Sequence, residues 1–367
     1  MTQRIGIAGG GQLGRMLALA AHVLGHTVVV LDPTPNSPAA QVADKHIVGD
    51  YTDAAKMREL AAECDVLTFE VETVNADALE EISAQGFPVH PQPRTLSIIK
   101  DKLAQKKYLR DHGVPVAAFT DASEAEQLRY PYVLKARSGG FDGRGNALVH
   151  SESEVAAAYE KMKGAPAYAE GFVNFDRELA IVAARTVDGE IAVYPLVETV
   201  HKNHICHQVL MPAPVSAEMQ NKARELAERV LASFEGAGVF AIEMFQVGQE
   251  ILVNEIAPRV HNSGHLTIEA CETSQFAQHI LAITGEKLGS TGMAVPAAVM
   301  INILGERDGV ATPVGVEEAE QIEGVKVHIY GKMETRRERK MGHLTALGQT
   351  LEEATEKAER ARSLISI

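Results

Sequence analysis

The sequence contains no tryptophan, only three cysteines, and no apolar run near the roughly 20 residues that a bilayer-spanning helix needs. Cys64, Cys206 and Cys271 are far apart and form no C-x-x-C pair, so they predict neither a disulfide framework nor a zinc site. No basic segment with an apolar core precedes the first predicted strand, so we expect no signal peptide. These absences predict a reduced, cytoplasmic protein that is not bound to a membrane, with its cysteines in the core.

Positive charge is also scarce, because the net charge is −14 over 367 residues. Such an acidic chain is not expected to bind nucleic acid, whose phosphates attract basic surfaces. Basic residues gather in one segment, KMETRRERK at residues 332–340. By composition alone this segment is a solvated loop, although it could also attract an anionic substrate.

The pattern of predicted strands and helices divides the chain into three parts. Residues 1–100 alternate strand and helix, which is typical of a Rossmann-like parallel α/β layer. Residues 101–175 form a small α+β unit around a glycine-rich loop, and residues 176–367 contain longer β runs with helices between them. The predicted strands are 4–8, 27–31, 65–69, 88–90, 130–136, 146–150, 167–170, 178–185, 190–198, 238–247 and 250–257. The predicted helices are 13–24, 53–63, 76–84, 101–112, 152–163, 217–234, 273–281 and 351–365.

A first glycine loop follows the first predicted strand. Gly9, Gly11 and Gly14 have the G-x-G-x-x-G spacing, and Asp32 ends the next strand, where a ribose-binding acid would lie in a dinucleotide-binding fold. This loop alone would predict an NAD(P)-dependent dehydrogenase. That reading explains none of the motifs further along the chain.

A second glycine loop, RSGGFDGRG, lies between two predicted strands, with Lys135 at the end of the first. A loop of this kind can fold over phosphates and offer them its backbone N–H groups, while a lysine adds a point charge. A plain glycine hairpin is the alternative interpretation.

A hairpin around Gly248 carries Glu243 and Glu255 on apolar strands. A three-residue turn would set these carboxylates opposite each other, whereas a two-residue turn would offset them by one position. Facing carboxylates repel, and Mg²⁺ relieves that repulsion while it binds ATP phosphates. Asn254 and Asn262 could complete the oxygen shell. The alternative, two solvent-exposed strand acids, is disfavoured by the apolar flanks.

A polar loop follows the second of these strands, in the sequence APRVHNSGHLT. Five hydrogen-bonding side chains fall within seven positions: Arg259, His261, Asn262, Ser263 and His265. A structural loop could be this polar, but its place after a metal-carrying strand favours catalysis. Its arginine can bind a planar oxyanion with two hydrogen bonds.

These motifs, in this order, resemble the ATP-grasp superfamily, and within it the N5-carboxyaminoimidazole ribonucleotide synthetases of purine biosynthesis. The resemblance covers nearly the whole chain through seven blocks: GGGQLGRM, LDPTPNSPA, TFEVETV, GGFDGRGN, VETVHKN, APRVHNSGH and YGKMETRRERKMGH. It implies an ATP-grasp fold with a Rossmann-like first domain that binds no dinucleotide, a small lid domain and a mixed C-terminal domain.

The resemblance also implies roles for individual residues. Glu178 would receive the ATP ribose hydroxyls, residues 170–173 would contact adenine, and Glu243 and Glu255 would bind Mg²⁺. The implied ATP contacts are Arg94, Lys135, Gly140, Phe141, Asp142, Gly143, Arg144, Gly145, Asn146, Glu170, Gly171, Phe172, Val173, Glu178, His201, Asn254 and Glu255. The implied ribonucleotide contacts are Gln12, Leu13, Glu70, Lys332, Arg339 and Lys340. Arg259, His261 and Asn262 would handle bicarbonate or carboxyphosphate, with Lys340 also in the catalytic set and Asp142 or His261 as candidate proton acceptor.

The implied reaction joins bicarbonate to 5-aminoimidazole ribonucleotide with ATP, through carboxyphosphate, under a closed glycine-loop lid. The resemblance further implies a homodimer whose product passes to a mutase. The sequence departs from the family at Phe141, where a tyrosine is usual, and at Leu266, where a tryptophan is usual. A formate-dependent glycinamide ribonucleotide transformylase is the nearest rival, since it would share the ATP and metal sites. A non-catalytic binding protein would not need paired metal acids.

Overall fold

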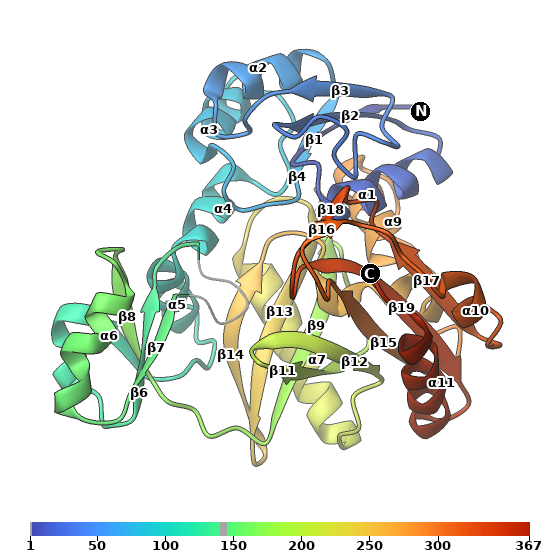
Figure 1. Ribbon diagram of the computed structural model, residues 1–367. Helices are drawn as coiled ribbons and strands as arrows, with labels where there is room; N and C mark the ends of the chain where they lie inside the picture. The colour runs from blue at the N-terminus through green and yellow to red at the C-terminus, as the bar shows by residue number, and fades with distance from the viewer. Residues whose placement is uncertain (1, 140–144) are drawn as a thin grey trace.

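The structure is a computed structural model that describes residues 2–139 and 145–367. Its main sheets lie in three regions (Figure 1): a parallel sheet formed by the N-terminal residues, a small antiparallel sheet, and a large antiparallel sheet that continues to the C-terminal region. Within the described residues, no helix is both long and apolar enough to span a bilayer.

The N-terminal sheet is parallel and has the strand order β3-β2-β1-β4. Residues 88–90, which were a predicted strand, contribute only one bridge between Leu67 and Val89. The sequence does not predict β3, because its four residues, KHIV, show neither an apolar run nor a clear alternation. The strands are β1 (Arg4–Ala8), β2 (Thr27–Asp32), β3 (Lys45–Val48) and β4 (Val66–Phe69). The helices are α1 (Gln12–Val23), α2 (Ala54–Ala62), α3 (Ala76–Ala84), α4 (Pro93–Lys100) and α5 (Lys102–Asp111).

The small sheet is antiparallel and has the order β5-β8-β6-β7. Its two central strands carry a tyrosine, leucine and alanine core, and the second glycine loop connects β6 to β7. Its elements are β5 (Phe119–Asp121), η1 (Ala122–Gln127), β6 (Tyr132–Ala136), β7 (Asn146–Val149), η2 (Glu152–Glu154), α6 (Val155–Lys161) and β8 (Ala167–Gly171).

The large sheet has nine strands in the order β14-β13-β9-β11-β12-β15-β19-β17, with β10 paired to β9, and a two-stranded ribbon of β16 and β18 lies beside it. The predicted strand at 190–198 is two strands, because Pro195 separates them. Its strands are β9 (Arg177–Arg185), β10 (Ile191–Val193), β11 (Val197–Lys202), β12 (Ile205–Met211), β13 (Gly238–Val247), β14 (Glu250–Ala257), β15 (Ala297–Leu304), β17 (Val325–Ile329) and β19 (Lys340–Gly348), and the ribbon is β16 (Gly309–Val310) with β18 (Glu334–Thr335). The helices are α7 (Ala217–Ser233), η3 (Asn262–Gly264), α8 (Thr267–Ala270), α9 (Gln275–Ile283), α10 (Val316–Glu320) and α11 (Leu351–Leu364).

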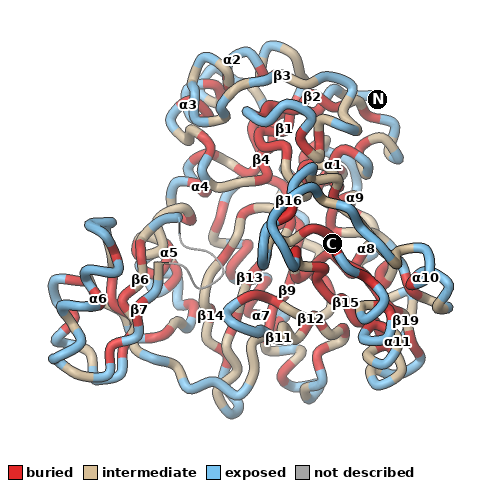
Figure 2. Tube along the Cα trace, in the orientation of Figure 1, coloured by how far each residue is buried: buried red, intermediate tan, exposed pale blue. Residues whose placement is uncertain are grey.

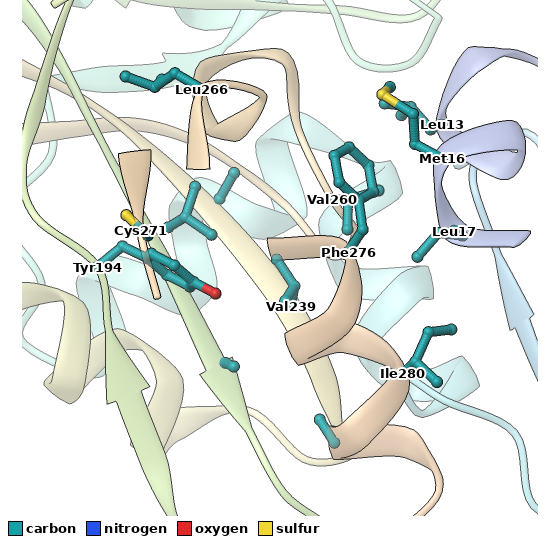
Figure 3. Close-up of a cluster of buried hydrophobic side chains, with 14 of the residues drawn as sticks. Leu13, Met16, Leu17, Tyr194, Val239, Val260, Leu266, Cys271, Phe276 and Ile280 are labelled. Carbon is teal, nitrogen blue, oxygen red and sulfur yellow. The ribbon is translucent and has the colours of Figure 1, made fainter. Parts of the chain in front are cut away.

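The N-terminal sheet is joined to the large sheet by an apolar cluster between α1 and α9. Leu13, Met16 and Leu17 of α1 belong to the same buried cluster as Phe276 and Ile280 of α9 (Figure 3). Burial is extensive along β1, β2 and β4 and along β9, β13, β15 and β19 (Figure 2). At about 25 cal/mol per Å² of apolar surface, such a continuous cluster fixes the first region against the third.

Candidate functional site

The glutamate hairpin has the predicted pairing, but a different feature produces it. The turn contains two residues, 248–249, which alone would set Glu243 opposite Asn254. A β-bulge at Asn254 places one extra residue in β14 and brings Glu255 opposite Glu243. The expectation that a three-residue turn is required is therefore wrong, because the bulge restores the register.

The two paired carboxylates have different electrostatic surroundings. Lys102 Nζ lies 2.6 Å from Glu255 Oε2. Burial raises the pKa of Glu255, but Lys102 and other nearby ammonium groups more than offset this and keep it below its usual range. Burial and the charge of Glu255 raise the pKa of Glu243 to about 7. About a third of each side chain stays exposed (30% and 38%), so a cation can reach this pair of hard oxygen donors.

A buried ion cluster connects the small sheet to this hairpin. Two ammonium groups contact the carboxylate of Glu170 in β8: Lys135 Nζ lies 2.5 Å from Oε1 and Lys106 Nζ lies 2.7 Å from Oε2. The Glu170 side chain is only 3% exposed. Burial raises the pKa of Glu170, but the two ammonium groups bring it down to about 2. Lys135 Nζ also lies 3.4 Å from Asn254 Oδ1 at the bulge. The carboxylate of Glu170 is thus used to orient Lys135, and an adenine contact from residues 170–173 would have to come from other atoms.

The polar loop after β14 is fixed by two amide side chains. Gln275 accepts from the N–H of His261 at 3.0 Å and donates to its carbonyl at 2.7 Å. The amides of Asn262 and Asn302 donate to each other at 2.9 and 2.8 Å. The geometry therefore makes Asn262 an anchor of the loop, and its predicted contact with bicarbonate or metal stays a prediction.

His261 points its other ring nitrogen at the paired carboxylates. Its Nδ1 accepts from the N–H of Ser263, so the neutral ring carries its proton on Nε2, which lies 3.4 Å from Glu243 Oε1. Burial and the nearby Arg259 lower the pKa of His261 well below its usual value. His261 is thus a neutral hydrogen-bond donor, which makes it a poor proton acceptor.

One small cavity brings together residues from several of the predicted groups. Its volume is about 50 Å³, and it is lined by Thr199, His201, Cys206, Glu243, His261, Asn262, Ser263 and Lys340. His201 also contacts the carboxylate of Glu178. Burial lowers the pKa of His201, but this carboxylate more than offsets burial and raises that pKa above its usual value. The cavity therefore joins predicted metal, bicarbonate and ribonucleotide residues at one place.

Arg259 is oriented by the N-terminal region. Its Nη2 lies 2.8 Å from Glu72 Oε1, and its Nη1 donates to the carbonyl of Val260 at 3.0 Å. Its Nε is buried, and within the described residues it has no hydrogen-bond partner. This Nε–H is the one guanidinium nitrogen without a partner among the described residues, and an anion such as bicarbonate could accept from it.

The first glycine loop is closed by a carboxylate of the chain itself. Glu70 accepts from the N–H of Gly11 and, at 2.8 Å, from that of Gly14. A Cβ at Gly14 would lie 2.7 Å from the backbone carbonyl oxygen of Gly9, so glycine is required there. Glu70 thus occupies the N-terminus of α1, where unpaired backbone N–H groups stabilise an anion. Substrate contacts by Glu70, Gln12 and Leu13 stay predictions.

Asp32 is likewise used inside the chain. It accepts from the N–H of Gly10 at 2.7 Å and from that of Thr34 at 2.8 Å. Its buried carboxylate therefore shapes the loop and does not present itself to a cofactor ribose.

The basic segment is only partly a solvated loop: Arg336 and Arg337 are exposed, whereas Lys332, Arg339 and Lys340 are half-buried. Lys332 Nζ donates to the carbonyl of Lys340 at 2.6 Å, and Arg339 Nη1 donates to that of Glu334 at 2.6 Å. Burial, with Arg339 nearby, lowers the pKa of Lys332 to about 7. Of this segment, Lys340 lines the cavity, and Lys332 is hydrogen-bonded to its carbonyl, so these two residues lie where they could meet an anion.

The remaining predicted contacts that the structure describes lie on α4 and in or next to the small sheet. Arg94 is exposed on α4, Gly145 precedes β7, Asn146 pairs with Lys135 across β6 and β7, and Gly171 ends β8. The residues Gly140, Phe141, Asp142, Gly143 and Arg144 lie outside the described residues. Phe172 is exposed and Val173 half-buried, directly after β8. Leu266 is fully buried in the cluster of Figure 3, where it is a packing residue.

Sequence reasoning missed several residues of the site. Four residues contact a predicted site residue although no motif gave them a role: Lys102, Lys106, Glu72 and Asn302. Lys102 and Lys106 are four apart, so they lie on the same side of α5. That spacing is a usable signal, as is the place of Glu72 in the TFEVETV block, whereas Asn302 lies in no quoted block.

A glycine-loop sheet connected through buried lysines to a hairpin of facing carboxylates defines an ATP-grasp protein. Family profiles agree: an ATP-grasp domain matches residues 107–276, a ribonucleotide synthetase preATP-grasp domain matches 1–100, and a phosphoribosylaminoimidazole carboxylase C-terminal domain matches 298–357. The N5-carboxyaminoimidazole ribonucleotide synthase of Synechococcus elongatus is 38% identical, over 100% of this chain and 94% of that one. The chain belongs to this synthase family and is an ATP-dependent ligase of purine biosynthesis.

Solved structures give the same result. The N5-carboxyaminoimidazole ribonucleotide synthetase of Thermotoga maritima is 44% identical with a TM-score of 0.91, covering 100% of this chain and 99% of that one. The Aspergillus clavatus synthase, solved with ADP and 5-aminoimidazole ribonucleotide, is 38% identical with a TM-score of 0.91, covering 99% and 98%. The chain spans about two thirds of the length of the phosphoribosylaminoimidazole carboxylases that it also matches.

Proposed function

We propose that this site carboxylates the exocyclic amine of 5-aminoimidazole ribonucleotide, with bicarbonate and ATP as co-substrates. The products are N5-carboxyaminoimidazole ribonucleotide, ADP and phosphate. One observation carries the proposal: a single cavity is lined by Glu243, His261 and Lys340, which were assigned to metal, bicarbonate and ribonucleotide. The Aspergillus clavatus structure with ADP and this ribonucleotide supports it.

The reaction has two steps. An oxygen of bicarbonate attacks the γ-phosphorus of ATP, the bond to ADP breaks, and carboxyphosphate forms. Carboxyphosphate then releases CO₂ and phosphate; the amine attacks the CO₂ carbon, and the departing phosphate can accept the proton that the amine loses. Both carboxyphosphate and the carbamate product react with water, so the site must exclude it.

Different residues of the site bind the phosphates, the bicarbonate and the metal. Lys135, oriented by Glu170, offsets charge on the ATP phosphates, and Arg259, oriented by Glu72, binds bicarbonate through its unpaired Nε–H. His261 donates from Nε2 to an oxygen of the carboxyl group. Glu243 and Glu255, with the bulged Asn254, form a hard-oxygen donor set that fits Mg²⁺. When bound, Mg²⁺ would neutralise charge on the transferring phosphoryl group.

Replacing Lys340 by alanine is expected to weaken binding of the ribonucleotide. A charge-assisted hydrogen bond contributes about 1.5–3 kcal/mol, so the KM for 5-aminoimidazole ribonucleotide should rise roughly ten- to hundredfold. The KM for ATP should stay within about twofold. Initial rates with each substrate varied in turn measure this, and Lys326→Ala on the exposed side of β17 is the control. An unchanged KM for the ribonucleotide removes Lys340 from its site.

Cation binding is expected to release a proton below neutral pH. Because the pKa of Glu243 is raised to about 7, its carboxyl group is protonated at pH 6, and a cation must displace that proton. Calorimetry of Mg²⁺ binding in two buffers of different ionisation enthalpy should give close to one proton released per cation at pH 6. The value should fall toward zero at pH 8.5. Equal values at both pH values would show that Glu243 is not a ligand.

The raised pKa of Glu243 also makes the stability of the folded chain depend on pH. A carboxyl group whose pKa is higher in the folded than in the unfolded chain stabilises the folded state when protonated. This contribution is lost as pH rises from about 4.5 to about 7. Above pH 7 the repulsion of two carboxylates remains, and a cation relieves it.

ADP formation with different acceptors tests the proposal against its nearest rival. The enzyme would be given Mg²⁺ and ATP with 5-aminoimidazole ribonucleotide, or with glycinamide ribonucleotide and formate, each with and without bicarbonate. Turnover that requires 5-aminoimidazole ribonucleotide and bicarbonate supports the proposal. Turnover only with formate would keep the ATP-grasp class and change the substrates.

We also propose three properties of the protein in the cell. The resemblance supports a homodimer, transfer of the unstable carbamate to a mutase, and a cytoplasmic location. Sedimentation of the purified chain tests the first of these directly.

A further inference from the structure

His279 of α9 lies outside the cavity yet binds two regions of the chain. It is fully buried. Its Nδ1 accepts from the N–H of Val239 at 3.0 Å, so its Nε2 carries the proton and donates to Thr68 Oγ1 at 2.8 Å. Burial lowers the pKa of His279 to about 3, so the ring is neutral. One neutral imidazole therefore bridges β4 of the N-terminal sheet and β13 of the large sheet.

The backbone around this imidazole is shaped to admit it. Gly238, the first residue of β13, has a φ of +122°, and a Cβ there would lie 3.0 Å from His279 Cε1. Val239 and Ile280, the neighbours of this contact along the chain, belong to the apolar cluster of Figure 3. The imidazole is thus fixed on both sides, and its position cannot shift without moving β13.

Both strands that His279 joins lead directly to the site. Two residues after Thr68, Glu70 closes the first glycine loop, and two further on Glu72 binds Arg259. On the other strand, Val239 precedes Glu243 by four residues. The ribonucleotide and bicarbonate residues that depend on β4 are therefore held at a defined distance from the metal carboxylates that depend on β13.

We propose that His279 is a positioning residue that couples the N-terminal half of the site to the glutamate hairpin through Thr68 and Val239. It touches no substrate. The inference rests on the proposed function, since it assigns the two halves to ribonucleotide and nucleotide. Loss of the bridge moves Glu72 and the glycine loop relative to the hairpin, while the lysine cluster at the nucleotide side stays in place.

The test compares Thr68→Val with Thr68→Ser. Valine has the shape of threonine but removes the acceptor of His279 Nε2, whereas serine keeps it. Thr345→Val is the matched control, because Thr345 is also fully buried and its hydroxyl has no hydrogen-bond partner within the described residues. Calorimetry would measure the Kd of 5-aminoimidazole ribonucleotide and of ADP for each protein, with the wild type first.

Thr68→Val should raise the Kd of the ribonucleotide by about fivefold or more and leave that of ADP within about twofold, because small displacements of positioned groups are costly. Thr68→Ser and Thr345→Val should resemble the wild type. If Thr68→Val does not fold, His279→Gln and His279→Leu are compared instead. His279→Gln should retain more ribonucleotide affinity than His279→Leu, because a glutamine amide can both accept and donate a hydrogen bond. If the wild type binds the ribonucleotide and Thr68→Val binds it with equal affinity, the inference is overturned while the proposed function stands. A wild type that does not bind it overturns the proposed function and the inference with it.

Discussion

Glu255→Gln is expected to lower ATP turnover by on the order of 10³-fold while the fold stays intact. The substitution keeps the volume of the side chain and removes one of two facing charges. Metal-assisted charge stabilisation contributes several kcal/mol to such a transfer, and about 1.4 kcal/mol corresponds to tenfold in rate. Lys102 also loses the carboxylate that lies 2.6 Å from its Nζ, so the local charge becomes more positive and repels a cation. Steady-state ADP release measures the loss.

A neighbouring glutamate provides the control. Glu250 lies on the same strand and is exposed, so Glu250→Gln should keep wild-type turnover. Circular dichroism spectra that coincide for the two variants and the wild type exclude unfolding as the cause. Turnover by Glu255→Gln within about twofold of the wild type would contradict the metal assignment.

Glu170→Gln is expected to lower the free energy of unfolding by about 3–5 kcal/mol, the usual cost of removing one partner from a buried ion pair. Its carboxylate lies between Lys106 and Lys135 with a 3% exposed side chain, so the substitution leaves two ammonium groups without their shared counter-charge. ATP turnover should fall as well, because Lys135 loses the group that orients it. Urea unfolding at pH 7 measures the first effect.

The pH dependence of the same variant gives a second test. Because the pKa of Glu170 is lowered to about 2 in the folded chain, its stabilisation is present above about pH 4.5 and is lost as pH falls from there through 2. The difference in stability between wild type and Glu170→Gln should therefore shrink in that range. Glu81→Gln, which removes an exposed pair with Arg58, should cost less than about 1 kcal/mol. A Glu170→Gln variant as stable as Glu81→Gln would contradict the buried cluster.

Much of the site follows from local sequence. The positions of Glu243 and Glu255 on either side of Gly248 predict that they lie on the two strands of one hairpin, although their exact pairing needs the bulge. The position of Lys135 near the end of a strand before the second glycine loop is also as expected, while its contact with ATP phosphates stays a prediction. In both cases the informative residues are close along the chain, so periodicity and turn chemistry carry the signal.

Other features depend on contacts that no local pattern encodes. Lys102 meets Glu255 across 153 positions, and the bulge at Asn254 follows from how β14 pairs, which the turn alone does not determine. Glu70 fills the helix N-terminus that the glycine spacing offers to a ligand, because β4 lies beside β1 in the folded sheet. The continuous apolar run of β15 could equally be a buried helix, so its strand was not predicted. The domain boundaries at 100 and 175 stay predictions.

The central claim is that this chain activates bicarbonate as carboxyphosphate for transfer to 5-aminoimidazole ribonucleotide. The most direct measurement is mass spectrometry of the phosphate formed from ¹⁸O-labelled bicarbonate and unlabelled ATP. Since a bicarbonate oxygen bridges carbon and phosphorus and leaves with phosphorus, we predict one ¹⁸O atom per phosphate, in a reaction that requires the ribonucleotide. Phosphate that forms at the same rate without label would contradict the account.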